Sequence, residues 1–251
     1  MCGRFVATTP PSVVAAHFDA APLERAAFGP SFNVAPTDPI LAVVTDRDGA
    51  RRVDCLRWGL IPSWTRPPAR PGALPSGAGM INARAETITT KAAFRRAFTR
   101  RRCLVPADGF YEWQRSADGT KQPWYIRRRD GSPLALAGIW ETWHPPAPGS
   151  APVRTGAIIT TTANGLMAGV HDRMPVILEA ADFDAWLDPH HDGDDALVTL
   201  LRPAADATLV RHPVSSGVNR VANNDPILIA VQEPGAGRPQ SPERAVPLTL
   251  L

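Results

Sequence analysis

The sequence predicts an α+β protein with one domain, built on a mostly antiparallel, curved and barrel-like β-sheet flanked by several short helices. Three observations predict this fold. Short apolar runs bounded by turn residues outnumber helical patterns. The 27 prolines among 251 residues are about twice the usual share of roughly 5%, which works against long helices. Helices do not alternate regularly with the strands, so a repeated βαβ unit is not indicated.

The predicted elements follow from these patterns. Apolar runs ending at turn signals predict strands at residues 40–44, 53–58, 124–126, 134–140, 157–162, 176–178 and 227–231. Helical spacing of apolar residues predicts helices at residues 11–18, 90–100, 180–187 and 196–201. Thr8 and Thr9 are the candidate N-caps of the first helix.

Composition also predicts the domain boundaries. We expect one domain over residues 1–232, with loop insertions at about 66–79 and 144–152, because both stretches are rich in Pro, Gly and Ala. Residues 233–251 form a Pro/Gly-rich tail.

Several functional classes are excluded. No apolar run approaches the ~18 residues of a membrane span, and the N-terminus lacks a signal-peptide pattern. With three cysteines, too few for a disulfide framework, we expect a cytoplasmic protein with no membrane partner. No metal-ligand spacing and no phosphate-binding glycine loop occurs, so no metal or cofactor is expected. Cys55 and Cys103 lie in apolar runs and are predicted to be small core residues.

Charge is unevenly distributed. Residues 91–130 carry eleven lysines and arginines against four acids, whereas residues 179–195 are strongly acidic. The basic stretch could present one face to a polyanion. The alternative is that both stretches are solvated faces of unrelated helices.

Cys2 follows the initiator methionine. Loss of Met1 would leave an N-terminal cysteine, a 1,2-aminothiol whose amine (pKa ~7.7–8.0) and thiol (~8.5) both supply nucleophile near neutral pH. An aldehyde would form a Schiff base with the amine, and the thiol could then close a thiazolidine ring. Such a residue can also act as its own base in hydrolysis. The alternative is a chance cysteine at position 2.

Four further segments contain polar residues in unusual settings. FNVAPT includes Asn33, and INARAET places Asn82, Arg84 and Glu86 at alternate positions, which share a face if the backbone is extended. VPADGFYEW has a predicted turn at residues 108–109 before Glu112, and HDRMP contains His171. Each segment alone also has a purely structural interpretation.

Taken together, these segments resemble the SOS-response-associated peptidase (SRAP) family. The resemblance rests on eight ordered blocks covering residue 2 to about 231: MCGRF, NVAPT, WGLIPSW, INARAET, CLVPADGFYEW, KQPWYI, HDRMPVIL and HPVS. It implies an SRAP-type domain that recognises abasic sites in single-stranded DNA. It also implies a covalent thiazolidine between mature Cys2 and the ring-opened sugar, which protects the lesion, and autoproteolytic release of Met1.

The resemblance also implies roles for individual residues. Cys2 would be the nucleophile, Glu112 the catalytic carboxylate and His171 the acid or base, with Asn82 hydrogen-bonded near the sugar. The residues implied for DNA binding are Arg84 and Arg173 on phosphates, Arg4 as a further cation, and Asn33 and Pro36 lining the site.

A nearby aromatic ring could stack on an unpaired base, and Trp64 is the candidate. The alternative for Trp64 is a core position. Two features depart from the family pattern: Thr65 stands where a second tryptophan is common, and the loop at 66–79 is long.

Three functions remain open from the sequence. The first is a covalent sensor of abasic single-stranded DNA, expected to be a monomer. The second is an N-terminal-nucleophile cysteine peptidase acting on peptides in trans. The third is a non-catalytic single-strand binding module that uses residues 91–130.

Overall fold

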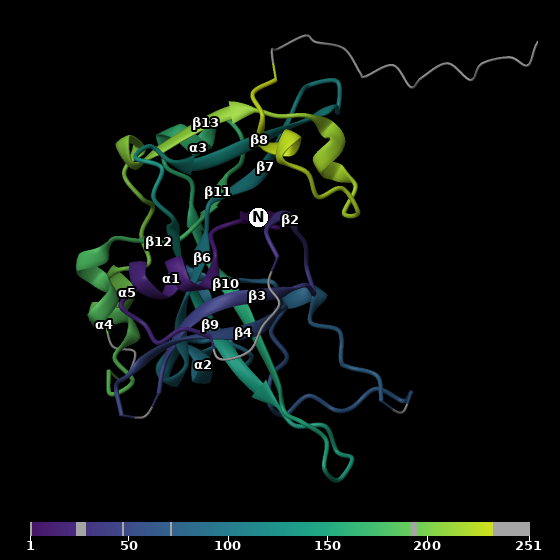
Figure 1. Cartoon of the computed structure of the whole chain (residues 1–251), viewed down its shortest axis with the longest axis vertical. Coiled ribbons are helices and arrows are strands. Elements are labelled where there is room, and N and C mark those ends of the chain that lie inside the picture. Colours follow the sequence, from purple (N-terminus) through teal and green to yellow (C-terminus); the bar gives the residue numbers. More distant parts are fainter. Residues whose placement is uncertain (1, 24–28, 47, 71, 192–194, 233–251) are drawn as a thin grey trace, which may run out of the picture.

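Two β-sheets form the core of the computed structural model, which describes residues 2–23, 29–46, 48–70, 72–191 and 195–232. The N-terminal end of the chain lies between them, near the centre of the molecule (Figure 1). The expected α+β fold with a mostly antiparallel, barrel-like core is confirmed. Among the described residues, no helix combines the length and apolar character needed to cross a membrane.

The larger sheet closes into a five-stranded barrel. Its strands pair in the order β10-β4-β3-β6-β9, and β9 pairs again with β10, which closes the ring. The β10–β4 pair is parallel and the other pairs of the ring are antiparallel. The barrel strands are β3 (Pro39–Thr45), β4 (Arg51–Trp58), β6 (Arg102–Ala107), β9 (Leu134–Trp143) and β10 (Val153–Thr162). Three short strands extend this sheet: β5 (Asn82–Arg84), β11 (Arg173–Pro175) and β12 (Ile177–Leu178).

The barrel interior leaves no room for a side chain at two glycines. A Cβ atom at Gly138 would lie 2.8 Å from the Cys103 sulfur, and one at Gly156 would lie 2.9 Å from Cδ1 of Leu56. Glycine at these positions therefore lets β9 and β10 approach the packed interior. Cys103 is fully buried as predicted, whereas Cys55 is only half-buried.

The smaller sheet is entirely antiparallel and has the order β13-β8-β7-β1-β2. Its strands are β1 (Phe5–Ala7), β2 (Ser31–Val34), β7 (Gly109–Arg115), β8 (Lys121–Arg128) and β13 (Leu209–Pro213).

The chain crosses from the barrel to the smaller sheet at Asp108. The turn predicted at residues 108–109 is wrong, because only Asp108 bends and the chain then continues directly into β7. The Asp108 carboxylate accepts hydrogen bonds from the backbone and hydroxyl groups of Thr8 and Thr9. The two threonines therefore fix this crossing and do not cap the first helix, whose N-cap is Pro10.

Short helices surround the barrel. In Figure 1, α1, α4 and α5 lie on one side, α2 lies below, and α3 lies beside the smaller sheet. The predicted helix at 90–100 is shorter than expected, and the predicted strand at 227–231 is wrong. Residues 226–229 instead form a 3-10 helix, since Pro226 begins it and the Asp225 carboxylate accepts a hydrogen bond from the Ile227 N–H. The helices are α1 (Pro11–His17), α2 (Arg95–Arg100), α3 (Gly165–Ala168), α4 (Phe183–Leu187) and α5 (Asp195–Thr199).

The two predicted insertions meet in space. Residues of both line one apolar cavity of about 480 Å³, which also includes Trp143 at the end of β9. The Trp143 indole N–H donates to the carbonyl of Thr65, 2.9 Å away, which ties the start of the first insertion to the barrel.

Burial of Cys103 predicts a loss of stability at alkaline pH. Burial raises the pKa of its thiol, while in the unfolded chain the thiol ionises near pH 8.5. The folded state therefore holds a proton that the unfolded state loses. The resulting stabilisation is complete below about pH 8.5 and falls by up to ~1.4 kcal/mol per pH unit above it. Urea unfolding between pH 7.5 and 9.5 should show this decline.

Cysteine variants separate this contribution from those of other groups. Cys103→Ala should make the decline less steep without abolishing it, because burial also raises the pKa of the Cys2 thiol. Cys55→Ala should change the slope less because Cys55 is only half-buried. Equal slopes for the wild type and Cys103→Ala would contradict the prediction.

Candidate active site around Cys2

Cys2 lies just before β1 and is completely buried. Strand β1 runs antiparallel to β7 with Phe5 opposite Phe110, and the pairing continues as the Tyr111 N–H donates to the Arg4 carbonyl at 3.0 Å. This register carries residue 2 alongside the part of β7 that contains Glu112, itself 2% exposed. Two residues far apart in the sequence thus become neighbours through strand pairing.

The environment of Cys2 keeps its thiol protonated. Burial raises its pKa most, and the negative charge of Glu112 raises it further. At neutral pH the resting group is therefore a thiol, which needs a nearby proton acceptor before the sulfur can react.

Asn82 holds the Cys2 backbone from the barrel side. It begins β5, which pairs in parallel with β10 and places Asn82 opposite Ile158. Its side-chain Nδ2 donates to the Cys2 carbonyl at 2.8 Å. The Asn82 Oδ1 atom is buried and has no hydrogen-bond partner among the described residues. That oxygen is therefore an acceptor available to a ligand at this site.

His171 follows α3 and is anchored through its backbone, because its N–H donates to the Met167 carbonyl at 2.9 Å. The backbone N–H of Arg173 donates to His171 Nδ1 at 3.0 Å, which leaves the proton of the neutral ring on Nε2. When the ring is doubly protonated, Nδ1 can instead donate to Asp172 Oδ1, 2.8 Å away. The side chain is thus arranged to accept and release a proton.

A cavity of about 300 Å³ joins the two predicted acid–base groups. It is lined by Glu112 and His171 together with Trp113, Arg115, Lys121 and Val170. Cys2, Asn82, Glu112 and His171 therefore lie in one region of the molecule, as the motifs suggested.

The INARAET segment is only partly extended. Asn82 and Arg84 lie in β5, but Glu86 lies in a 3-10 helix (Ala85–Thr87) and forms a two-bond ion pair with Arg173 at 2.9 Å. The Arg173 guanidinium holds the pKa of the Glu86 carboxyl below its usual range. Arg84 is exposed, whereas Arg173 also donates to the Thr160 carbonyl at 2.7 Å. Arg84 is thus the more accessible of the two cations.

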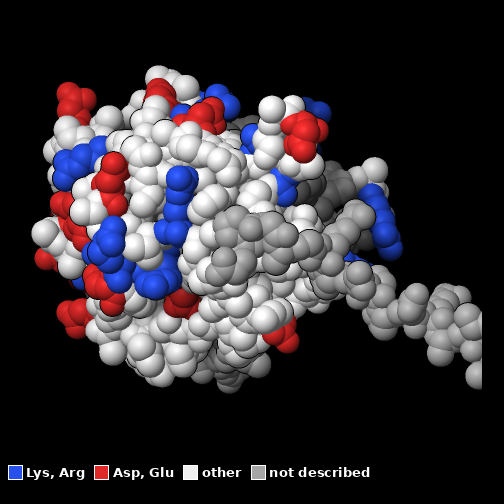
Figure 2. All heavy atoms as spheres, turned by 90° about the horizontal axis from the view of Figure 1, so that it is seen from above, with Lys and Arg blue, Asp and Glu red and all other residues white. Residues whose placement is uncertain are grey.

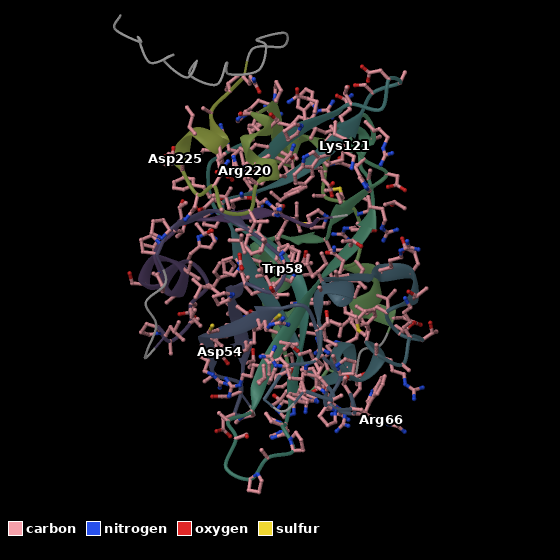
Figure 3. The ribbon with its side chains drawn as sticks, turned by 90° about the vertical axis from the view of Figure 1, so that its right-hand side faces the viewer. Asp54, Trp58, Arg66, Lys121, Arg220 and Asp225 are labelled. Carbon is pink, nitrogen blue, oxygen red and sulfur yellow. The ribbon has the colours of Figure 1, made fainter. Side chains whose placement is uncertain are left out.

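Arg4 and Asn33 make internal contacts. Arg4 donates to Asn33 Oδ1 at 2.8 Å and to the Val218 carbonyl at 2.9 Å. Asn33 Nδ2 donates to the carbonyls of Arg220 and Asn223 at 3.0 and 2.9 Å. The two residues therefore hold the segment around residues 218–223 against β1 and β2, at the end of the molecule where Figure 3 labels Arg220.

Pro36 and Trp64 lie in turns. Pro36 is half-buried and precedes Thr37, whose φ of 78° is a strained conformation for a β-branched residue. Trp64 is 67% exposed, so the alternative core position for it is wrong. Its exposed ring is free to stack, while Thr65 behind it is held by Trp143.

The basic stretch at 91–130 does not form one face. Arg101 pairs with Glu141, Arg128 pairs with Glu179, and Arg102 is buried among backbone carbonyls. The acidic stretch supplies some of these partners, because the fold brings the two stretches together. Figure 2 accordingly shows lysine and arginine interspersed with acids over the face seen from above.

Sequence reasoning missed three residues near the cavity. Arg115 and Lys121 line it directly. Gln114 donates to the Gly169 carbonyl at 2.8 Å and accepts a hydrogen bond from the Trp124 indole at 3.1 Å, which links β7 to the turn before His171. The sequence feature that could have identified them is the short SADGT turn, because it predicts a hairpin that places these residues beside Glu112. Within the described part of the chain, no group of three or more His, Cys, Asp or Glu residues could hold a metal ion.

Fold and site together define an α+β protein with a buried thiol at its N-terminal end, set between a barrel and a second sheet. The chain belongs to the SRAP family, because the family model described as SOS response associated peptidase matches residues 1–221.

Several relatives carry a common name. The chain is 40% identical over 230 residues to the abasic site processing protein YoqW of Bacillus subtilis, covering 91% of this chain and 99% of that protein. It is 34% identical to the abasic site processing protein HMCES of Xenopus tropicalis, covering 81% and 66% of the two chains. It is 31% identical to the abasic site processing protein YedK of Escherichia coli, covering 79% and 83%.

The fold also matches a solved structure. A crystal structure of a protein from Bacteroides thetaiotaomicron superposes with a TM-score of 0.81 at 26% identity, covering 92% of this chain and all of that one.

Proposed function

We propose that this protein processes abasic sites in single-stranded DNA by attaching covalently to them through Cys2. The observation that carries the proposal is the convergence of three segments on one buried place. Cys2 comes from the N-terminus, Asn82 from β5 and Glu112 from β7, and the Asn82 side chain donates a hydrogen bond to the Cys2 carbonyl. The relatives named as abasic site processing proteins support the same conclusion.

The chemistry requires removal of Met1, which we propose is autoproteolytic. The freed α-amine of Cys2 adds to the aldehyde carbon of the ring-opened sugar, and loss of one water gives an imine. The thiol sulfur then bonds to the same carbon while its proton ends on the nitrogen. The balance is one aminothiol and one aldehyde giving one thiazolidine and one water, with no oxidant or reductant.

The neighbouring groups match the proton transfers of this sequence. Glu112 lies close enough to raise the pKa of the Cys2 thiol and is the acceptor of its proton. His171 in its neutral form carries a proton on Nε2, which it donates to the sugar ring oxygen or to the departing hydroxyl. Asn82 orients the Cys2 backbone, and its free Oδ1 accepts from the new amine or from a sugar hydroxyl.

The surrounding side chains would position the strand. Arg84, which is exposed beside the site, binds a phosphate, and Trp64 stacks on an unpaired base. Arg173 reaches a phosphate by exchanging its contact with Glu86. Arg4 and Asn33 act indirectly by holding residues 218–223 in place, and Pro36 shapes the turn behind them.

The test is a denaturation-resistant adduct between the purified protein and a single-stranded oligonucleotide with one abasic site. Intact mass must first show loss of Met1. The wild type should form the adduct with a mass increase equal to the oligonucleotide minus one water. Cys2→Ala should form none, and Cys55→Ala should react like the wild type.

Two results would overturn the proposal. One is full adduct formation by Cys2→Ala. The other is turnover of peptides in trans without adduct formation, which would favour the peptidase alternative.

A further inference from the structure

The hairpin of β7 and β8 ends in two opposed cations. Arg115 lies directly across from Lys121, and the connecting turn is closed by the Ser116 N–H donating to the Thr120 carbonyl at 3.0 Å. Both side chains are exposed. Like charges directly opposite each other destabilise a strand pair, so this arrangement has a folding cost.

No acid offsets that cost within the described part of the chain. The carboxylate of the connecting turn, Asp118, accepts hydrogen bonds from the backbone and hydroxyl of Thr120 at 2.9 and 2.7 Å. These bonds lower the pKa of Asp118 and keep the carboxylate within its own turn. Other arginines, such as Arg128 and Arg51, instead have an acidic partner. What distinguishes Arg115 and Lys121 is that two cations lie directly opposite each other with no acidic partner among the described residues.

The pair lies at the candidate active site. Arg115 and Lys121 line the same cavity of about 300 Å³ as Glu112 and His171. Arg115 is three residues beyond Glu112 on β7, or roughly 10 Å at ~3.3 Å per residue. Figure 3 shows Lys121 at the same end of the molecule as Arg220, far from Asp54 and Arg66. The pair is thus about three residues along β7 from Glu112, within reach of a ligand that extends from the candidate active site along this cavity.

We propose that Arg115 and Lys121 together bind a backbone phosphate of the DNA strand, next to the nucleotide held at Cys2. This inference rests on the proposed function and names a phosphate subsite for it. A guanidinium binds two phosphate oxygens at once, and the ammonium on the opposite strand binds a third. A phosphate between the two cations also removes their mutual repulsion, which explains why the hairpin carries them.

Non-covalent binding tests the subsite separately from the chemistry. The Cys2→Ala protein is titrated with a single-stranded oligonucleotide that contains a tetrahydrofuran abasic analogue, which has no aldehyde. Adding Arg115→Ala or Lys121→Ala should weaken binding by about tenfold. The slope of log K against log salt should fall by ~0.7 for the lost phosphate contact. Arg95→Ala and Arg96→Ala, which remove exposed cations of α2, are the matched controls and should leave both quantities unchanged.

The melting temperature gives a second measurement, because a purely structural role for the two cations would not separate stability from DNA binding. Lys121→Glu places an acid opposite Arg115, so the melting temperature should stay the same or rise while oligonucleotide binding falls at least tenfold. A lower melting temperature with unchanged binding would overturn the proposal.

Inorganic phosphate distinguishes the two sources of the anion. If it raises the melting temperature of the wild type but not of Lys121→Glu, while oligonucleotide binding is the same in both, the pair binds free phosphate and the proposal fails. If the protein forms the adduct but its oligonucleotide affinity is unchanged by Arg115→Ala and Lys121→Ala, the phosphate subsite is refuted and the proposed function is not. Pair-dependent binding without any adduct refutes only the proposed function.

Discussion

Replacing Glu112 by glutamine is expected to slow adduct formation by about 10²- to 10⁴-fold, the range that a positioned acid–base group contributes. The amide keeps the shape of the side chain but cannot accept the Cys2 proton. Single-turnover rates with an abasic oligonucleotide measure the effect, using protein in which a specific protease has exposed Cys2.

The pH dependence separates catalysis from structure in this variant. The Glu112 charge raises the pKa of the Cys2 thiol, so its removal should lower that pKa, while burial still keeps it above the ordinary value. The rise in rate that accompanies thiol ionisation should therefore move to lower pH in Glu112→Gln. Glu179→Gln, which removes a surface partner of Arg128, should keep the wild-type rate and profile. A Glu112→Gln protein with a wild-type rate would remove Glu112 from the mechanism.

Replacing Arg102 by methionine is expected to destabilise the fold by about 3–5 kcal/mol, because several buried carbonyls lose their donor at ~1–3 kcal/mol each. The Arg102 side chain is buried and donates to the backbone carbonyls that end two helices. In α2 these are Phe98 and Thr99. At the end of α4 they are Trp186 and the C-cap Asp188, and His191 follows in the next turn. Methionine fills part of the volume but leaves these carbonyls without their donor.

The loss should lower the melting temperature by roughly 10 °C for a chain of this size. Differential scanning calorimetry is the measurement. Arg96→Ala, which removes an exposed arginine of the same helix, should change stability by no more than ~0.5 kcal/mol. If Arg102→Met melts with the wild type, the network does not stabilise the helix ends.

Local sequence patterns predicted six of the thirteen described strands. The apolar runs of β3, β4, β9 and β10 lie within one or a few residues of their predicted limits, because a buried strand needs apolar residues wherever the chain runs. Prediction failed where a local cap overrode an apolar run. Residues 227–231 look like a strand, but the local Asp225 cap and Pro226 begin a 3-10 helix.

The site shows the same division. The sequence named Cys2, Asn82, Glu112 and His171, and the structure brings them together. The sequence could not show that Arg4 and Asn33 donate hydrogen bonds to residues 218–223, which lie about two hundred positions further along the chain. Nor could the sequence show that Arg101 and Arg128 of the basic stretch form ion pairs with Glu141 and Glu179 from other segments.

The sequence by itself therefore determined the α+β class, the family resemblance and the presence of an aminothiol precursor at position 2, since these depend on residue order alone. The tertiary structure decided that Cys2 is buried beside Glu112 and that its thiol is held protonated. It also decided that Arg115 and Lys121, which have no acidic partner among the described residues, line a cavity with Glu112. These are properties of neighbours in space. Desolvation and charge interactions depend on distance through the fold, and strand pairing places residues next to each other that the sequence keeps more than a hundred positions apart.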